Sequence, residues 1–170
     1  CYTEDKSGVG HFYGHAAKSA VTAEKILKRL RFDRKTQETV ALLVGRHGLP
    51  LFDDEKSLRR RLNRIGETDL RRLLDIRAAD TLAKSPQDRG RLGDLERTRD
   101  ALERILSKRQ CFSLRDLAVH GGDLIAAGVP EGEEVGRTLR ALLNAVIDGN
   151  CPNEKEKLLE YAKRRKEGKA

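Results

Sequence analysis

The chain has 170 residues, of which 38% are hydrophobic and 36% charged, and its formal net charge is +8 at pH 7. This length allows one domain or two small helical ones, and an aromatic content of 4% with no tryptophan disfavours a β-rich fold. No stretch approaches the roughly 20 apolar residues of a membrane span, so no membrane association is expected.

The cysteines and the charge favour a cytoplasmic protein with a polyanionic partner. Cys1, Cys111 and Cys151 show no paired spacing, which indicates free thiols in a reducing compartment. The sequence pI is about 9.6. Basic residues outnumber acidic ones along the whole chain except in 121–152, so a long basic surface is more plausible than one small patch.

Apolar spacing in the first half predicts four helices and no period-2 strand. The first ends near Arg31, and the second begins after the capping residue Asp33 and stops at Gly48. The third closes at Gly66, and the fourth runs to Ala83. A polar stretch after this helix predicts a domain boundary, with one helical domain over 1–86 and a second over 87–170.

The second half begins with a long helix through 95–106. Ser113 and Asp116 then have capping-box spacing, which predicts a short helix that reaches His120. Gly121-Gly122 is expected to break the chain. An amphipathic helix then ends at Gly149, and a final helix ends in basic residues. The predicted fold class is all-α, a multi-helix array of two packed helical subdomains.

Three polar residues are candidates for a metal site: His15, which lies at the head of the first predicted helix, and His47 and Asp80, which continue the apolar stripes of later helices. A buried polar group without a partner costs about 1–3 kcal/mol, and a metal or mutual hydrogen bonds would remove that cost. Imidazole and carboxylate ligands suit several divalent ions. The alternative is ordinary pairing, with His47 at a helix end and Asp80 beside Arg77.

Basic runs on solvated helix faces and one glycine segment are candidates for nucleic-acid binding. Arginine and lysine of this kind would hold a phosphate backbone without reading sequence, and scarce aromatics favour a folded RNA duplex over a single strand. Gly121-Gly122 could expose helix amides to phosphate, although close helix packing is the preferred interpretation and nearby acidic residues oppose phosphate. The predicted RNA-binding residues are Arg59, Arg60, Arg64, Arg71, Arg72, Gly122, Arg137, Lys163, Arg164 and Arg165.

The order of several motifs resembles two known families. His11 to Ala20, His47 and Ala79-Asp80 resemble the rear part of an HD domain without its His-Asp doublet. The longer series resembles the body and tail of bacterial tRNA nucleotidyltransferases, the CCA-adding and poly(A) polymerase family. The motifs that carry this second resemblance are Gly10 to His15, Leu30-Arg31-Phe32, Leu74 to Asp80, Gly122 to Ile125, Gly128, Gly132, Gly136 and Pro152-Asn153-Glu154.

The resemblance implies that this sequence is part of a longer enzyme that adds nucleotides from CTP and ATP, with Mg²⁺, to tRNA 3′ ends. Catalysis in that family belongs to an N-terminal head, which is expected to be a partner missing from this sequence. We therefore expect the chain itself to bind tRNA, to need no cofactor and to have no transferase activity.

Two alternatives remain at the level of sequence. One is an HD-type metal-dependent phosphohydrolase, which would turn over a generic phosphodiester with Mn²⁺, Ni²⁺ or Co²⁺. The other is a helical protein-interaction module, whose association with a protein would be insensitive to salt, whereas tRNA binding would weaken with salt.

Overall fold

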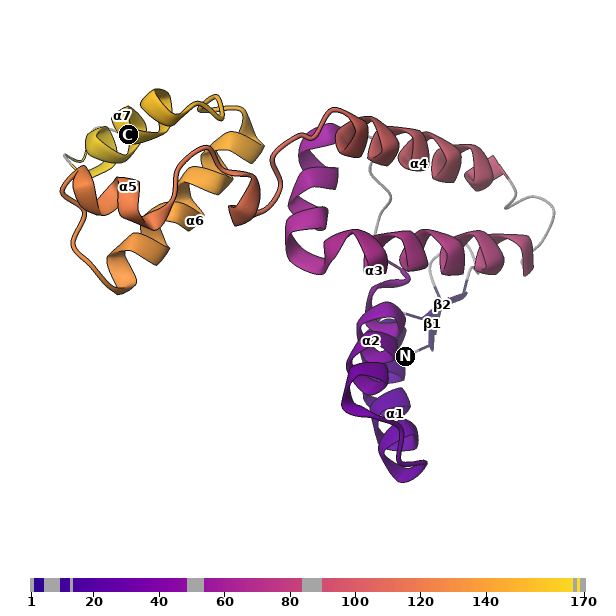
Figure 1. Ribbon diagram of the computed structural model, residues 1–170. Coiled ribbons are helices and arrows are strands. Elements are labelled where there is room, and N and C mark those ends of the chain that lie inside the picture. Colours follow the sequence, from indigo (N-terminus) through magenta and orange to yellow (C-terminus); the bar gives the residue numbers. More distant parts are fainter. Residues whose placement is uncertain are drawn as a thin grey trace. The chain divides into compact units, whose positions relative to one another are not determined.

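The computed structural model describes residues 2–4, 10–12, 14–48, 54–83, 90–166 and 168, with 2–4, 10–12, 91 and 166 described by their backbone alone. The regular secondary structure of these residues is helical, apart from one pair of short strands (Figure 1). The predicted all-α fold class is therefore confirmed. Internal contacts divide the chain into two units, Cys1–Leu51 with Glu67–Glu96 and Phe52–Gly66 with Arg97–Ala170. The boundary predicted between residues 86 and 87 lies outside the described residues and stays a prediction.

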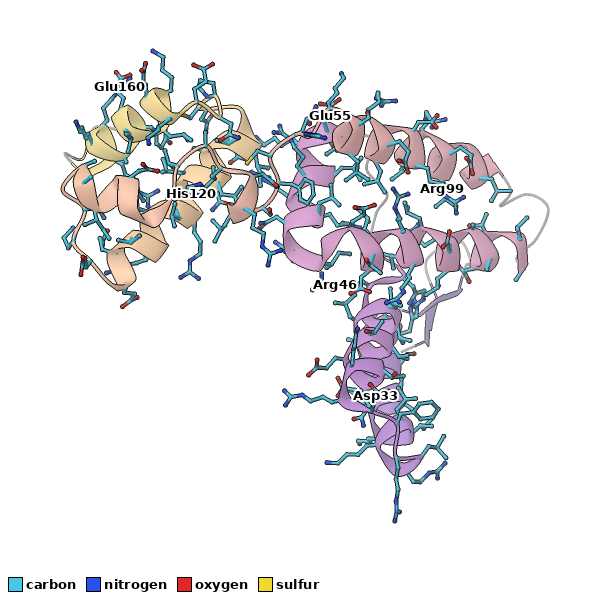
Figure 2. The ribbon with its side chains drawn as sticks, viewed as in Figure 1. Asp33, Arg46, Glu55, Arg99, His120 and Glu160 are labelled. Atoms are coloured by element: carbon cyan, nitrogen blue, oxygen red, sulfur yellow. The ribbon has the colours of Figure 1, made fainter. Side chains whose placement is uncertain are left out.

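The first unit contains the paired helices α1 (His15–Arg29) and α2 (Arg34–Arg46). The cap predicted for α2 is confirmed, because Thr36 donates its backbone N–H to Asp33 Oδ1 at 3.0 Å, and Figure 2 labels Asp33 at this helix start. No residue of α1 is fully buried, and Leu30, just after its end, is 58% exposed.

The prediction that no strand forms is wrong near the start of the chain. Strands β1 (Tyr2–Glu4) and β2 (Gly10–Phe12) pair in antiparallel register, with Tyr2 opposite Phe12. Each strand has three residues, which is too short for a period-2 pattern to be recognised in the sequence.

Helix α3 (Glu55–Ala83) contains the break that the sequence predicts. Gly66 adopts φ 79° and ψ 166° within it, so two helical segments meet at this glycine. The change between the two contact units falls at the same residue. Asp54 begins the first segment by accepting the backbone N–H of Ser57 at 2.8 Å.

The second unit surrounds helix α6 (Glu133–Asp148), which packs against α5 (Gly121–Ala126), α7 (Lys155–Lys166) and the one-turn 3₁₀ helix η2 (Leu114–Asp116). Helices α5 to α7 are orange to yellow in Figure 1. Helix α4 (Arg91–Ser107) supplies residues to both units. The core of the second unit consists of Cys111, Leu117, Val119, Leu124, Leu142, Leu143, Ala145, Val146, Ile147, Cys151, Leu158 and Ala162.

Two sequence predictions in this unit are wrong. The helix expected from Ser113 to His120 is only the single turn η2, although Asp116 Oδ2 does accept the backbone N–H of Ser113 at 2.8 Å. Gly121-Gly122 begins α5 instead of breaking the chain. A Cβ at Gly121 would lie 3.2 Å from Val135 Cγ1, so the missing side chain lets α5 and α6 approach closely. In the described part of the chain, no helix is both long and apolar enough to cross a membrane.

Candidate nucleic-acid interface

Two of the predicted RNA-binding arginines join α3 to the end of α6 within the second unit. Arg59 donates from Nη2 to the carbonyl oxygen of Ile147 at 3.0 Å and from Nη1 to that of Val146 at 3.4 Å. Arg60 Nη2 pairs with Asp148 Oδ1 at 2.6 Å. A cation near a helix C-terminus complements the partial negative charge of the last carbonyl groups. Both guanidinium groups therefore have a packing role, whatever else they contact.

The remaining predicted arginines of α3 differ in their partners. Arg71 Nε pairs with Glu67 Oε1 at 2.9 Å, and Arg72 Nη1 pairs with Asp69 Oδ1 at 3.0 Å. These are local pairs within one helix, of a type that contributes about 0.3–0.5 kcal/mol. Arg64 is exposed, and its guanidinium has no hydrogen bond or ion pair to the described residues. Arg64 is thus the member of this group with its full charge available to a ligand.

Helices α6 and α7 also carry both cations with an ion pair and cations without one among the described residues. Arg137 Nη2 pairs with Glu134 Oε2 at 2.9 Å, and Arg164 Nη2 pairs with Glu160 Oε1 at 2.6 Å. Figure 2 labels Glu160 on α7. Lys163 is exposed and forms no ion pair with any described residue.

Arg165, the last predicted cation whose side chain is described, lines a cavity of about 570 Å³ in the second unit. Glu131, Glu133 and Glu134 belong to the same wall, and Val129 and Pro130 supply apolar surface. The three carboxylates oppose an anionic ligand inside this cavity. A phosphate that binds Arg165 is therefore expected to lie outside this cavity.

Gly122 lies in the first turn of α5, where backbone N–H groups are directed toward the helix start. The carboxylate of Asp123 lies at the start of this helix. Its Oδ2 accepts the backbone N–H of His120 at 2.8 Å, and its Oδ1 pairs with Lys155 Nζ at 2.6 Å. The hydrogen bond from Lys155, followed by that from His120, lowers the pKa of Asp123. This carboxylate competes with a phosphate at the helix start, which favours the packing role that the sequence suggested for these glycines.

The structure brings together two of the three candidate metal ligands. His15 Nε2 and His47 Nε2 are 3.2 Å apart, and His47 Nδ1 lies 2.7 Å from the carbonyl oxygen of Val44. Because a carbonyl can only accept, His47 carries a proton on Nδ1, and a neutral His47 ring then presents Nε2 as the acceptor for His15. Asp80 is exposed, so its predicted position on an apolar face is wrong.

These positions leave the metal assignment open. In residues 14–48, 54–83 and 90–166, no group of three or more His, Cys, Asp or Glu side chains that could hold a metal ion is present. The histidine pair also satisfies itself by the hydrogen bond between the rings. The metal site of His15, His47 and Asp80, and the HD resemblance behind it, stay predictions.

Sequence reasoning assigned no contact of their own to two groups of polar residues in the second unit, although Asn153 belongs to one of the motifs quoted above. Asn153 donates from Nδ2 to the carbonyl oxygen of Asp116 at 2.7 Å and accepts the Ala118 N–H at 2.9 Å, so it connects the start of α7 to η2. Arg104 and Lys108, near the end of α4, are exposed and form no ion pair with the described residues. Their one-turn spacing was visible in the sequence, but only the structure shows that neither pairs with a carboxylate in the described part of the chain.

The sequence matches the family model described as "tRNA nucleotidyltransferase domain 2 putative" over residues 12–162. The chain therefore belongs to the tRNA nucleotidyltransferase family, as its motifs suggested. It is similar to the CC-adding tRNA nucleotidyltransferase of Thermus thermophilus, with 36% identity over 146 residues that cover 85% of this chain and 32% of that protein.

A second relative matches over a shorter segment. The CCA-adding enzyme of Limosilactobacillus fermentum is 43% identical over 47 residues, which are 28% of this chain and 12% of that enzyme. The chain thus spans about a third or less of the length of the curated relatives it matches. No solved structure matches it.

Proposed function

We propose that this chain is the tRNA-holding helical part of a template-independent tRNA nucleotidyltransferase. The observation that carries the proposal is the family match over residues 12–162, together with the name of the Thermus thermophilus relative, which adds nucleotides to tRNA. The net charge of +8 supports a polyanionic ligand.

The described side chains support recognition of phosphates and RNA shape. Exposed cations that form no ion pair with the structurally described residues occur in both contact units, among them Lys28 in the first and Lys163 in the second. Such groups attract a phosphate backbone without reading its sequence. Aromatic residues are only 4% of the chain, which disfavours base stacking along a single strand. A folded RNA such as tRNA is therefore the ligand that these features fit best.

We further propose that the chemistry belongs to the larger part of such proteins that this chain does not match. In the longer protein, that part would bind Mg²⁺ and the nucleotides of CTP and ATP, and the helices described here would hold the acceptor RNA. The match to 32% of the Thermus thermophilus protein leaves ample length for such a head. The chain alone is then expected to bind tRNA without extending it.

The test is a binding titration with fluorescent tRNA at low ionic strength, followed by an incorporation assay with tRNA that lacks its 3′ CCA. We expect a shift in tRNA migration or anisotropy at micromolar protein, and no incorporation of labelled CTP or ATP. An equally long unstructured RNA serves as the control ligand. Absence of any tRNA binding would contradict the proposal.

The same material tests the competing HD hydrolase. A generic phosphodiester is incubated with Mn²⁺, Ni²⁺ or Co²⁺, and variants His15→Ala and His47→Ala are compared with the wild type. Metal-dependent turnover that both variants abolish would replace our proposal with the hydrolase. We expect no turnover.

A further inference from the structure

The C-terminal end of α4 carries three neighbouring cations: Arg104, Lys108 and Arg109. All three are exposed, and none forms an ion pair with a described residue. Arg104 and Lys108 are one helical turn apart, so they lie on the same side of α4 and repel each other. The helix C-terminus attracts them in part, but no carboxylate of the described residues pairs with them.

Arg109 adds a backbone feature to this surface. It adopts φ 46°, in the left-handed region, and it ends α4 through hydrogen bonds from its own N–H to Leu106 and from Gln110 N–H to Ile105, both 3.0 Å. The same pair of bonds ends α1 at another arginine, Arg31 (φ 57°), whereas in α5 and α6 the left-handed residues are Gly128 (φ 87°) and Gly149 (φ 79°).

Glycine adopts this conformation without the steric cost that a Cβ atom brings. An arginine at such a position keeps a strained backbone that a glycine would relieve. Strain of this kind persists where the side chain or the conformation has a function. The unpaired guanidinium of Arg109 is the group that can supply one.

The surface is polar throughout. No large hydrophobic side chain between residues 103 and 110 is exposed. A protein partner usually covers an interface with an apolar centre, whereas phosphates need only cations and hydrogen-bond donors. The surface therefore fits a nucleic-acid backbone better than it fits an acidic protein.

We propose that Arg104, Lys108 and Arg109 contact the phosphate backbone of a folded RNA duplex. This inference rests on the proposed tRNA-holding function and identifies a contact surface for it. It places the RNA at cations that form no ion pair with the described residues, in contrast to paired residues such as Arg60 and Arg164.

The test measures tRNA affinity as a function of KCl for four variants. Arg109→Gly should weaken binding and reduce the slope of log K against log [KCl] by about 1, and the combined change of Arg104→Gln, Lys108→Gln and Arg109→Gly should reduce it by about 3. Arg109→Lys keeps the charge and should retain the wild-type slope. Arg34→Gln is the matched control, because it removes one arginine that is already paired with Glu38 at 2.7 Å.

Thermal unfolding separates a ligand contact from a structural role. Arg109→Gly should leave Tm unchanged or raise it by up to about 2–4 °C, because it relieves the left-handed arginine. Three results would overturn the inference. The first is a wild-type slope in the triple variant, and the second is a loss of tRNA affinity in Arg109→Lys or Arg34→Gln equal to that in Arg109→Gly. The third is competition by polyglutamate as strong as that by an RNA duplex. If wild-type protein binds tRNA and one of these results appears, the tRNA-holding function stands and only this surface is wrong; if wild-type protein does not bind, both proposals fall.

Discussion

Arg59 differs from the other arginines in its run because its guanidinium hydrogen-bonds the last carbonyl groups of α6. Arg60 forms a more exposed pair with Asp148, in which the two side chains are 55% and 23% exposed. A hydrogen bond from a charged group contributes about 1.5–3 kcal/mol, whereas a surface ion pair contributes about 0.2–1 kcal/mol. Neighbouring arginines in one basic run therefore have unequal structural roles.

We predict that Arg59→Ala lowers the free energy of unfolding by about 1.5–3 kcal/mol and that Arg60→Ala lowers it by less than about 1 kcal/mol. Urea denaturation followed by circular dichroism measures both values. Arg64→Ala, which removes an exposed arginine of the same helix with no partner among the described residues, is the control and should stay within about 0.5 kcal/mol of the wild type. Equal effects for Arg59 and Arg60 would contradict the capping role of Arg59.

Cys111 is the residue with the clearest dependence on pH. Burial, with a smaller contribution from Asp116, raises the pKa of its thiol from 9.0 to about 11, and nearby Arg59 opposes the shift. The folded state therefore holds the proton more tightly than the unfolded state does. This contribution to stability is complete below pH 9 and is lost as the pH rises toward 11.

We predict that the free energy of unfolding falls more steeply between pH 9 and pH 11 in the wild type than in Cys111→Ala. Lysine and tyrosine titrate in the same range, so the difference between the two proteins is the quantity that matters. The buried thiol should also react slowly with iodoacetamide at pH 8. Parallel stability curves for the two proteins would show that Cys111 does not titrate as expected.

At the scale of elements, the chain follows its local signals closely. Asp33 caps the helix that the sequence assigned to it, and Gly149 ends α6 in the left-handed conformation. These predictions succeed because a cap or a glycine stop involves residues only a few positions apart. The helix expected after Ser113 failed because the capping geometry predicts where a turn begins and not how far it continues.

Gly66 gives an element-scale prediction. Its φ of 79° and ψ of 166° lie in a region that is essentially restricted to glycine. Gly66→Ala should lower the free energy of unfolding by about 1–3 kcal/mol, measured by urea denaturation. Gly122→Ala is the matched control: a Cβ there would meet no atom within 4 Å, so the change should stay within about 0.5 kcal/mol. A wild-type stability for Gly66→Ala would show that α3 tolerates a different backbone at the break.

At the scale of the whole molecule, the excess of positive charge decides how the chain meets RNA. Internal ion pairs hold several cations, such as Arg60 and Arg164. Basic residues still outnumber acidic ones, which gives the chain a formal net charge of +8. Binding of a polyanion by such a protein releases counterions, and the affinity then falls with salt in proportion to the number of phosphates contacted.

We predict that tRNA affinity falls by about 10³–10⁵ between 50 and 200 mM KCl if about 6–10 phosphates are contacted. Anisotropy titrations at four salt concentrations measure the slope directly. A titration of the same tRNA with an acidic protein of similar size is the control for nonspecific signal. A tRNA affinity that does not change with salt would contradict binding through the phosphate backbone.

The amino-acid sequence alone determined the all-α class, most helix limits and the family, because periodicity, caps and motif order are properties of residues that lie close together in the chain. The sequence could not determine which cations pair with internal carboxylates and which can contact a ligand. Arg60 and Asp148 are 88 positions apart, and only folding brings them together.

The tertiary structure also decided which of the candidate metal ligands lie next to each other. His15 and His47 form a hydrogen bond because α1 and α2 pair, and Asp80 remains on the surface. In both cases the deciding contacts join elements distant in sequence, and no local pattern encodes which carboxylate or imidazole a side chain will meet.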